Sequence, residues 1–180
     1  MKDNKFNFCP DCGSRNVSTL MNGRKWLCND CGFDLYNNVA SAVGVILENA
    51  EGKILLETRA KEPRKGFLAF PGGFCDPDET AEEACARECF EEIGIHPADI
   101  KFLCSFPNTY EYKNVVYKTC DLFFSAKIPE GAQFNPQKSE VQSYSFVSAS
   151  TKEEIEKIPL AFDSARKTLL KRLEVLEHGE

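Results

Sequence analysis

The sequence predicts an α/β domain that follows a small cysteine-rich segment. Stretches of apolar and β-branched residues, of which 39–47 is the first, interleave along the chain with stretches whose apolar residues repeat at helical spacing. Before residue 39 the chain is poor in aliphatic residues and carries four of the nine cysteines. We therefore expect two domains, at residues 1–37 and 38–180.

The N-terminal cysteines form two Cys-x-x-Cys pairs separated by fifteen residues: Cys9 with Cys12, and Cys28 with Cys31. This spacing is typical of a four-cysteine zinc ribbon, in which two tight turns present four thiolates to one tetrahedral ion. Because all four ligands come from the protein, the expected Zn²⁺ site is closed and structural. Between the pairs, Asn22-Gly23 predicts the tip of a β-hairpin.

The second domain is expected to alternate strands and helices. Strands are expected at 39–47, 53–58, 67–74, 100–106, 115–128 and 141–147, the third interrupted by Pro71-Gly72-Gly73. Thr80 and Glu83 have the spacing of a capping box, so a helix is expected to begin there and to end at Gly94. Two more helices are expected at 153–157 and 163–177, the last with apolar residues at helical spacing: Ala165, Leu169, Leu173 and Leu176.

The charge and composition restrict the classes of function. The net charge of −6 argues against broad electrostatic binding to nucleic acid, but it is compatible with a small phosphorylated substrate beside a metal ion. No signal peptide and no membrane-length apolar run is visible, so a cytoplasmic location is expected. In that compartment free thiols are the rule, and core positions are expected for the remaining cysteines: Cys75, Cys85, Cys89, Cys104 and Cys120.

The helix after Thr80 carries the residues that indicate chemistry. Glu88, Glu91 and Glu92 stand at i, i+3 and i+4, so they share one face and repel one another. A neighbouring stripe is apolar and is expected to pack into the core: Cys85, Cys89 and Ile93. Carboxylate oxygens are the ligands that hard divalent cations prefer, so this arrangement indicates a cation site.

Residues before and within the helix extend the pattern. Arg87 and Glu79 can form an ion pair that holds the helix against the preceding loop. Gly72 and Gly73 allow the backbone to turn tightly and to approach an ion closely.

These residues resemble the Nudix family, whose box is G-x5-E-x7-R-E-U-x-E-E-x-G-U, where U is a bulky aliphatic residue. The positions that match are Gly73, Glu79, Arg87, Glu88, Glu91, Glu92, Gly94 and Ile95. Cys89 replaces the first aliphatic residue of the box, and cysteine is small and readily buried.

The resemblance implies an α/β/α sandwich with a mixed sheet, a divalent cation (Mg²⁺ or Mn²⁺) and a homodimer. It implies that Glu88, Glu91, Glu92 and the Gly72 carbonyl bind the cation, and that Arg87 orients a catalytic glutamate. The implied reaction is the attack of water on phosphorus, in which the cation activates the water and neutralises charge. Glu140, just before the last strand, is the candidate for an acidic catalytic residue outside the box.

A zinc ribbon before a Nudix domain resembles the NADH pyrophosphatase branch of that family. After its box that branch has the motif S-Q-P-W-P-F-P-x-S, and this chain has Ser105-Phe106-Pro107-Asn108-Thr109-Tyr110, which retains serine and proline. Aromatic rings at Phe106, Tyr110 and Tyr112 are candidates to stack on a base of the substrate.

The expected function is hydrolysis of a pyrophosphate bond in a nucleoside diphosphate derivative, with NAD(H) or a related dinucleotide as the first choice. Hydrolysis of ADP-ribose, nucleotide sugars or dinucleoside polyphosphates stays open. An RNA cap-removing enzyme and a non-catalytic nucleotide-sensing module are the alternatives of another class. The net negative charge disfavours the RNA cap-removing enzyme, and the complete set of box glutamates disfavours the non-catalytic module.

Overall fold

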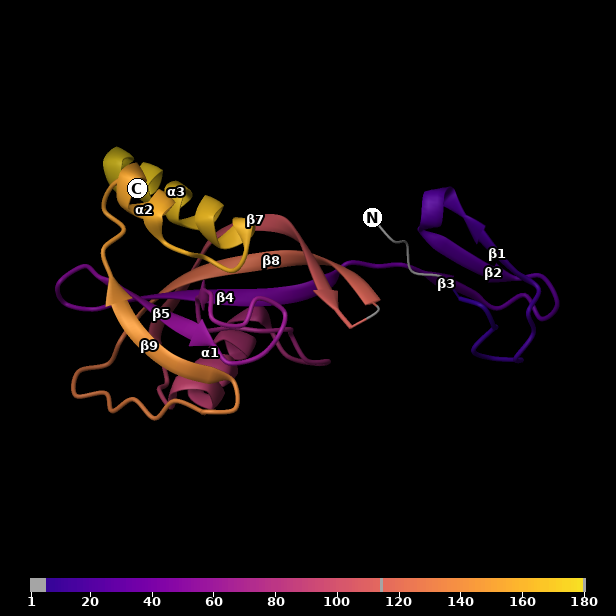
Figure 1. The fold of residues 1–180 in the computed structure, drawn as a ribbon, viewed down its shortest axis with the longest axis horizontal. Helices are drawn as coiled ribbons and strands as arrows, with labels where there is room; N and C mark the ends of the chain where they lie inside the picture. Colours follow the sequence, from indigo (N-terminus) through magenta and orange to yellow (C-terminus); the bar gives the residue numbers. More distant parts are fainter. Residues whose placement is uncertain (1–5, 114, 180) are drawn as a thin grey trace. The chain divides into compact units, whose positions relative to one another are not determined.

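A computed structural model describes residues 6–113 and 115–179 and divides the chain into two compact units (Figure 1). The first unit comprises the chain up to Val39 together with Thr109–Lys118. The second comprises Ala40–Asn108 together with the chain from Thr119 onwards. Among the described residues, no helix is both long enough and apolar enough to cross a membrane.

The N-terminal part of the first unit is a three-stranded antiparallel sheet. Its order is β1-β2-β3, with β1 at Val17–Leu20, β2 at Lys25–Cys28 and β3 at Asp34–Tyr36. The expected hairpin joins β1 to β2 through the 3-10 turn η1, Met21–Gly23, in which Asn22 has a φ of 55°. Asparagine is one of the few residues that tolerates this left-handed conformation, so the sequence at the tip suits the turn.

The second unit is built on a six-stranded sheet. Five strands follow the order β6-β5-β4-β8-β7, and β9 pairs with β5. Strand β4 pairs with β8 in parallel, whereas β5 pairs antiparallel with β4, β6 and β9, so the sheet is mixed as expected. The strands are β4 Ala40–Glu48, β5 Ile54–Arg59, β6 Leu68–Ala69, β7 Ala98–Tyr112, β8 Val115–Lys127 and β9 Val141–Val147.

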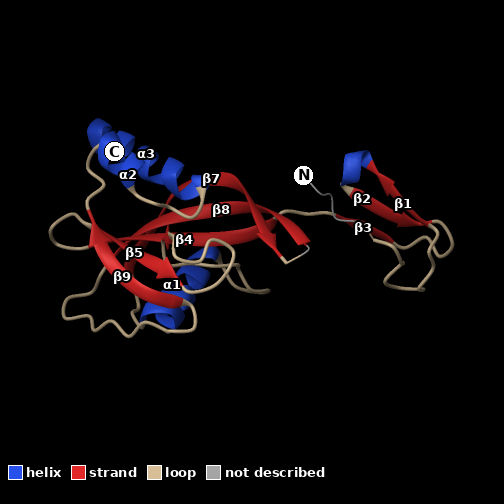
Figure 2. Cartoon of the chain, in the orientation of Figure 1, coloured by secondary structure: helices blue, strands red, loops and turns tan. Residues whose placement is uncertain are grey.

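Helices cover both faces of this sheet (Figures 1 and 2). Helix α1, Ala81–Ile93, lies on one face, and α2, Lys152–Lys157, and α3, Asp163–His178, lie on the other. Strand β5 contributes to both cores: Leu56 packs in the cluster of α2 and α3, and Leu55 packs in the cluster of α1. This arrangement confirms the α/β/α sandwich with a mixed sheet.

Two expected strands differ in length. The strand expected at 67–74 is reduced to β6, because the amides of Val43 and Val45 on β4 donate to the carbonyls of Gly73 and Pro71 and hold the segment as a loop along β4. The strand expected at 100–106 is longer, since it runs from Ala98 to Tyr112. Pro107 lies within it, and proline is tolerated there because β7 is the edge strand.

Several side chains differ from the core positions expected for them. Leu176 shares the helical spacing of α3 but lies in its last turn, where it is 61% exposed. Cys85 and Cys89 are fully buried as expected, whereas Cys75, Cys104 and Cys120 are only partly buried.

Candidate active site

Helix α1 begins and ends where its capping residues predict. Thr80 Oγ1 accepts a hydrogen bond from Glu83 N at 3.1 Å, and Glu83 Oε2 accepts one from Thr80 N at 2.7 Å, which completes the capping box. At the other end Gly94 adopts φ 77° and donates its N–H to Phe90 O. The apolar stripe of the helix is buried against the sheet and consists of Cys85, Cys89 and Ile93. Its burial fixes the rotation of the helix about its own axis. The box glutamates are thereby held at the edge of the helix that faces the loop 71–74.

Arg87 is the centre of a hydrogen-bond network in this loop and helix. Its Nε and Nη2 donate to the two carboxylate oxygens of Glu79 at 3.1 and 2.7 Å, which is a bidentate arrangement. Its Nη1 donates to Glu88 Oε1 at 2.8 Å and to Glu91 Oε2 at 3.3 Å. Nη2 also donates to the carbonyl of Phe74 at 3.0 Å. One guanidinium therefore connects the loop before α1 to two box glutamates.

Glu79 completes the loop side of this network. Its Oε1 accepts the N–H of Asp76 at 2.6 Å, and the Arg87 guanidinium holds the pKa of this carboxyl below its usual value. Glu79 is therefore an anion with a structural partner on each side, which agrees with its expected role as a clamp.

The two glycines of the loop permit close approaches on opposite sides. The Gly72 N–H donates to Glu92 Oε2 at 2.7 Å. A Cβ at Gly72 would lie 2.1 Å from the backbone oxygen of Val43, and a Cβ at Gly73 would lie 2.5 Å from Glu88 Oε1. Gly72 is thus pressed against β4, and Gly73 leaves room for the Glu88 carboxylate.

The box carboxyls are crowded and partly withdrawn from water. Burial raises the pKa of Glu92 to about 8, and although the Gly72 N–H opposes this, the charges of Glu88 and Glu140 add to it. Burial also raises the pKa of Glu88, against the lowering effect of Arg87. Buried like charges favour protonation unless a cation neutralises them. The chemistry of these donors therefore suits a hard divalent cation.

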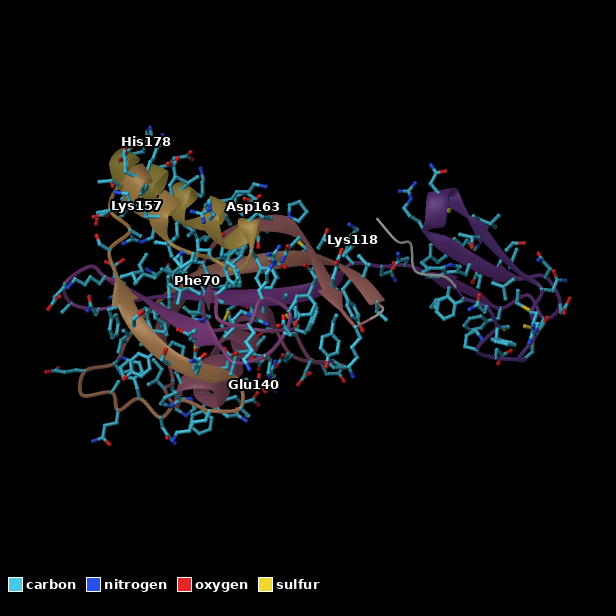
Figure 3. All side chains as sticks on the ribbon, in the orientation of Figure 1. Phe70, Lys118, Glu140, Lys157, Asp163 and His178 are labelled. Carbon is cyan, nitrogen blue, oxygen red and sulfur yellow. The ribbon has the colours of Figure 1, made fainter. Side chains whose placement is uncertain are left out.

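Glu140 approaches the box from outside it. It precedes β9 on the side of the sheet where α1 lies (Figure 3), and its charge raises the pKa values of both Glu88 and Glu92. Lys61 Nζ lies 2.5 Å from Glu140 Oε1. The structure therefore brings this expected residue into the electrostatic environment of the box.

Glu57 on β5 was missed by the sequence analysis. Its side chain is 4% exposed, and its Oε1 is buried with no hydrogen-bond partner among residues 6–113 and 115–179. Burial, followed by the charge of Glu92, raises its pKa well above the usual value. The available signal was an acidic residue two positions after Leu55, in a strand that begins with three apolar residues.

Of the expected aromatic residues, only Phe106 belongs to the same unit as the box. Phe106 is half-buried and packs against the core of α2 and α3, on the face opposite α1. Tyr110 and Tyr112 belong to Thr109–Lys118, which is part of the first unit. Their role in substrate binding stays a prediction.

The four N-terminal cysteines converge as their spacing predicts. Their sulfur atoms all lie within 4.8 Å of one another, with Cys9 Sγ to Cys31 Sγ at 3.7 Å and Cys12 Sγ to Cys28 Sγ at 3.6 Å. Four sulfurs at about 2.3 Å from a tetrahedral Zn²⁺ lie about 3.8 Å apart, so the cluster fits this ion. Backbone N–H groups of Cys31 and Asp30 lower the pKa of Cys28 to about 7, whereas the pKa values of Cys12 and Cys31 are raised beside the other thiols, so Cys28 is the thiol that deprotonates first among these three.

The NUDIX domain family matches residues 39–170 of the chain, which include the helix, the glycine loop and Glu140. The chain belongs to the Nudix family, and the resemblance that its box indicated is confirmed.

Curated relatives carry related names. A protein of Schizosaccharomyces pombe named NAD-capped RNA hydrolase is 34% identical in an alignment of 118 residues that covers 57% of this chain and 31% of that protein. The NAD-capped RNA hydrolase NudC of Deinococcus radiodurans is 27% identical over 164 residues, which are 90% of this chain and 55% of that protein. An ADP-ribose pyrophosphatase of Methanocaldococcus jannaschii is 48% identical over 65 residues, 36% of this chain and 38% of that protein. The chain thus spans about half or less of the length of these relatives.

Solved structures show the same fold. A NUDIX hydrolase from Nitrosomonas europaea superposes with a TM-score of 0.69 at 26% identity, and the match covers 96% of this chain and 93% of that one. A MutT protein from Methanosarcina mazei superposes with a TM-score of 0.61 at 26% identity, over 81% of this chain and 99% of that one. The expectation of a pyrophosphate-cleaving hydrolase agrees with the family and with the names of these relatives.

Proposed function

We propose that this chain hydrolyses the pyrophosphate bond of a dinucleotide such as NAD(H), with a divalent cation at the glutamates of α1. The observation that carries the proposal is the set of crowded, partly buried carboxyls of Glu88 and Glu92, held by Arg87 and by the loop at Gly72. A merely solvated acidic helix face would have no such supports.

The residues proposed to hold the cation are Glu88, Glu91, Glu92 and the carbonyl of Gly72. A bound Mg²⁺ or Mn²⁺ supplies charge neutralisation at the phosphate oxygens and makes water more acidic. Arg87 is proposed as a positioning residue, since its bonds to Glu79 and Glu88 orient the carboxylate that faces the substrate.

Glu140 is proposed to take a proton from the attacking water. Its pairing with Lys61 leaves the side chain partly exposed, so water can reach it. The charge that it places on Glu88 and Glu92 indicates that it acts in the same electrostatic environment. No covalent intermediate with the protein is part of this proposal.

The choice of a dinucleotide is supported by the relatives named NAD-capped RNA hydrolases. Those names also favour a second candidate, removal of an NAD cap from RNA. The net charge of −6 favours the free dinucleotide, because RNA binding gains most of its affinity from basic residues that contact phosphates. Stacking by Phe106, Tyr110 or Tyr112 belongs to this proposal.

The four-cysteine cluster is proposed to bind a structural Zn²⁺, on the basis of its sulfur spacing. The homodimer, the cytoplasmic location and the division at residues 37 and 38 stay predictions.

The test is a magnesium-dependent hydrolysis screen with identified products. The substrates are NADH, NAD, ADP-ribose, dinucleoside polyphosphates, nucleotide sugars and an NAD-capped RNA oligonucleotide. We expect NAD(H) to yield nicotinamide mononucleotide and AMP. Glu91→Gln and Glu92→Gln are expected to reduce turnover by about 100-fold or more, as removal of groups that stabilise the transition state does.

Glu82→Gln is the matched control, because Glu82 is exposed on the same helix and stands at a position that the box leaves unconstrained. Turnover like that of the wild type in both box variants would contradict the metal-site assignment. A marked preference for the capped RNA, lost at higher salt, would instead support the second candidate.

A further inference from the structure

Glu57 points toward helix α1 from the middle of strand β5. Successive side chains of a strand face opposite sides of its sheet, so Glu57 shares a face with Leu55. Leu55 packs in the core cluster that contains Cys85 and Cys89 of α1, whereas Leu56 packs in the opposite cluster. Both neighbours of β5 at this point are paired strands, with Glu57 opposite Ala69 on β6 and Tyr144 on β9. The strand therefore holds the carboxyl rigidly below the box helix.

The carboxyl of Glu57 lies in the electrostatic environment of the box glutamates. The negative charges of both Glu92 and Glu88 act on it. The positive charge of the Arg59 side chain also acts on Glu57. However, Arg59 Nε donates a hydrogen bond to the Pro63 carbonyl at 3.0 Å. Arg59 is thus committed to a neighbouring loop.

One oxygen of Glu57 has no hydrogen-bond partner in the part of the chain that the structure describes. Its Oε1 is buried and accepts no hydrogen bond from residues 6–113 or 115–179. Leaving a buried polar atom unsatisfied destabilises the folded state, so such a group is retained where something compensates for it. A leucine would fill this inward position at no such cost.

A divalent cation would compensate this cost. Carboxylate oxygens are its preferred ligands, and one ion beside Glu57 and Glu92 would satisfy the orphaned oxygen and remove the repulsion between the carboxyls. We propose that Glu57 is a further ligand of the cation site, supplied by the sheet rather than by the box helix. This inference rests on the proposed function, since it adds a ligand to the cation site on α1.

The test is a Mn²⁺ titration followed by electron paramagnetic resonance on the wild type, Glu57→Gln and Glu82→Gln. Glutamine keeps the size of the side chain, and its amide can donate to Glu92, so a purely structural role would survive the substitution. We expect Glu57→Gln to weaken Mn²⁺ binding by about tenfold or more, because even residues that only support a ligand commonly contribute that much. Glu82→Gln should bind as the wild type does.

Thermal melts separate a ligand from a structural residue. In magnesium-free buffer we expect Glu57→Gln to melt no lower than the wild type, and addition of Mg²⁺ should raise its melting temperature less than it raises that of the wild type. If Glu57→Gln fails to fold, Glu57→Asp provides the test, since it keeps the charge but withdraws the oxygens by one methylene. Weaker Mn²⁺ binding by Glu57→Asp would support the role of Glu57 as a ligand of the cation.

The outcomes distinguish this inference from the proposed function. Wild-type Mn²⁺ affinity in a folded Glu57→Gln, or in Glu57→Asp if that variant is used, overturns the role of Glu57 and leaves the box site intact. Absence of Mn²⁺ binding by the wild type itself overturns the cation site and, with it, both proposals.

Discussion

Alanine substitutions at Gly72 and Gly73 are expected to impair different properties of the protein, although the two residues are adjacent. A Cβ at Gly73 would meet Glu88 Oε1 at 2.5 Å, and the obstacle is the end of a flexible side chain. A Cβ at Gly72 would meet the backbone oxygen of Val43 at 2.1 Å, in a residue with φ 149°. The first clash can be relieved by moving a carboxylate, whereas the second requires the backbone of two segments to separate.

The magnitude for Gly73→Ala follows from the distance. The Glu88 carboxylate must retreat by about 0.9 Å to reach an ordinary contact of about 3.4 Å. Misplacement of a catalytic group by about 1 Å can reduce the rate about 100-fold. Gly73 does not have a positive φ, so alanine is not strained there. We therefore expect turnover to fall about 100-fold and Mn²⁺ affinity to weaken, while the melting temperature changes by no more than a few degrees.

Gly72→Ala is expected to lower the stability of the fold as well. Strain in a conformation that suits glycine costs about 1–3 kcal/mol, and overpacking costs a similar amount. A loss of about 3 kcal/mol or more corresponds to a drop of roughly 6–12 °C for a domain of this size.

Thermal melts, Mn²⁺ titration and steady-state hydrolysis on both variants provide the assay. Turnover and Mn²⁺ affinity like those of the wild type in Gly73→Ala would refute the argument that this glycine makes room for Glu88. A Gly72→Ala protein as stable as the wild type would refute the close approach to β4.

Three further predictions concern the network, the zinc cluster and pH. Arg87→Lys keeps the charge but cannot form the bidentate pair with Glu79, and we expect a loss of about 2 kcal/mol in the free energy of unfolding, measured by chemical denaturation; an unchanged value would show that the fork geometry contributes nothing. Cys28→Ser is expected to release Zn²⁺, measured as metal per chain, while the matched Cys120→Ser keeps it; full occupancy in Cys28→Ser would contradict the ribbon. Burial and neighbouring charges raise the pKa of Glu92 to about 8 in the folded protein, against about 4.3 in the unfolded chain. The folded state therefore binds the proton more tightly, and the resulting stability is fully present below about pH 4.3 and is lost as the pH rises through about 8. In magnesium-free buffer the melting temperature should therefore fall between about pH 5 and pH 8, and Mg²⁺ should restore it at pH 8; a flat profile would contradict the burial of this carboxyl.

Local sequence was sufficient wherever neighbouring residues determine the structure. The capping box at Thr80 and the left-handed Gly94 set the ends of α1, because both act through hydrogen bonds within one turn. The helical spacing of Glu88, Glu91 and Glu92 placed them on one edge, and the cysteine spacing predicted the cluster that the sulfur distances then confirmed.

Only the tertiary structure showed that a buried carboxyl of strand β5 faces the box helix. Glu57 lies 31 positions before Glu88 in the sequence, and nothing in its local pattern indicates that β5 passes beneath α1. The length of β6 was likewise set from a distance, since hydrogen bonds from β4 hold the Pro71–Gly73 loop. Helix caps and helical faces follow from contacts within a few residues. The residues that surround a buried carboxyl, by contrast, depend on strand pairing and packing across the whole domain.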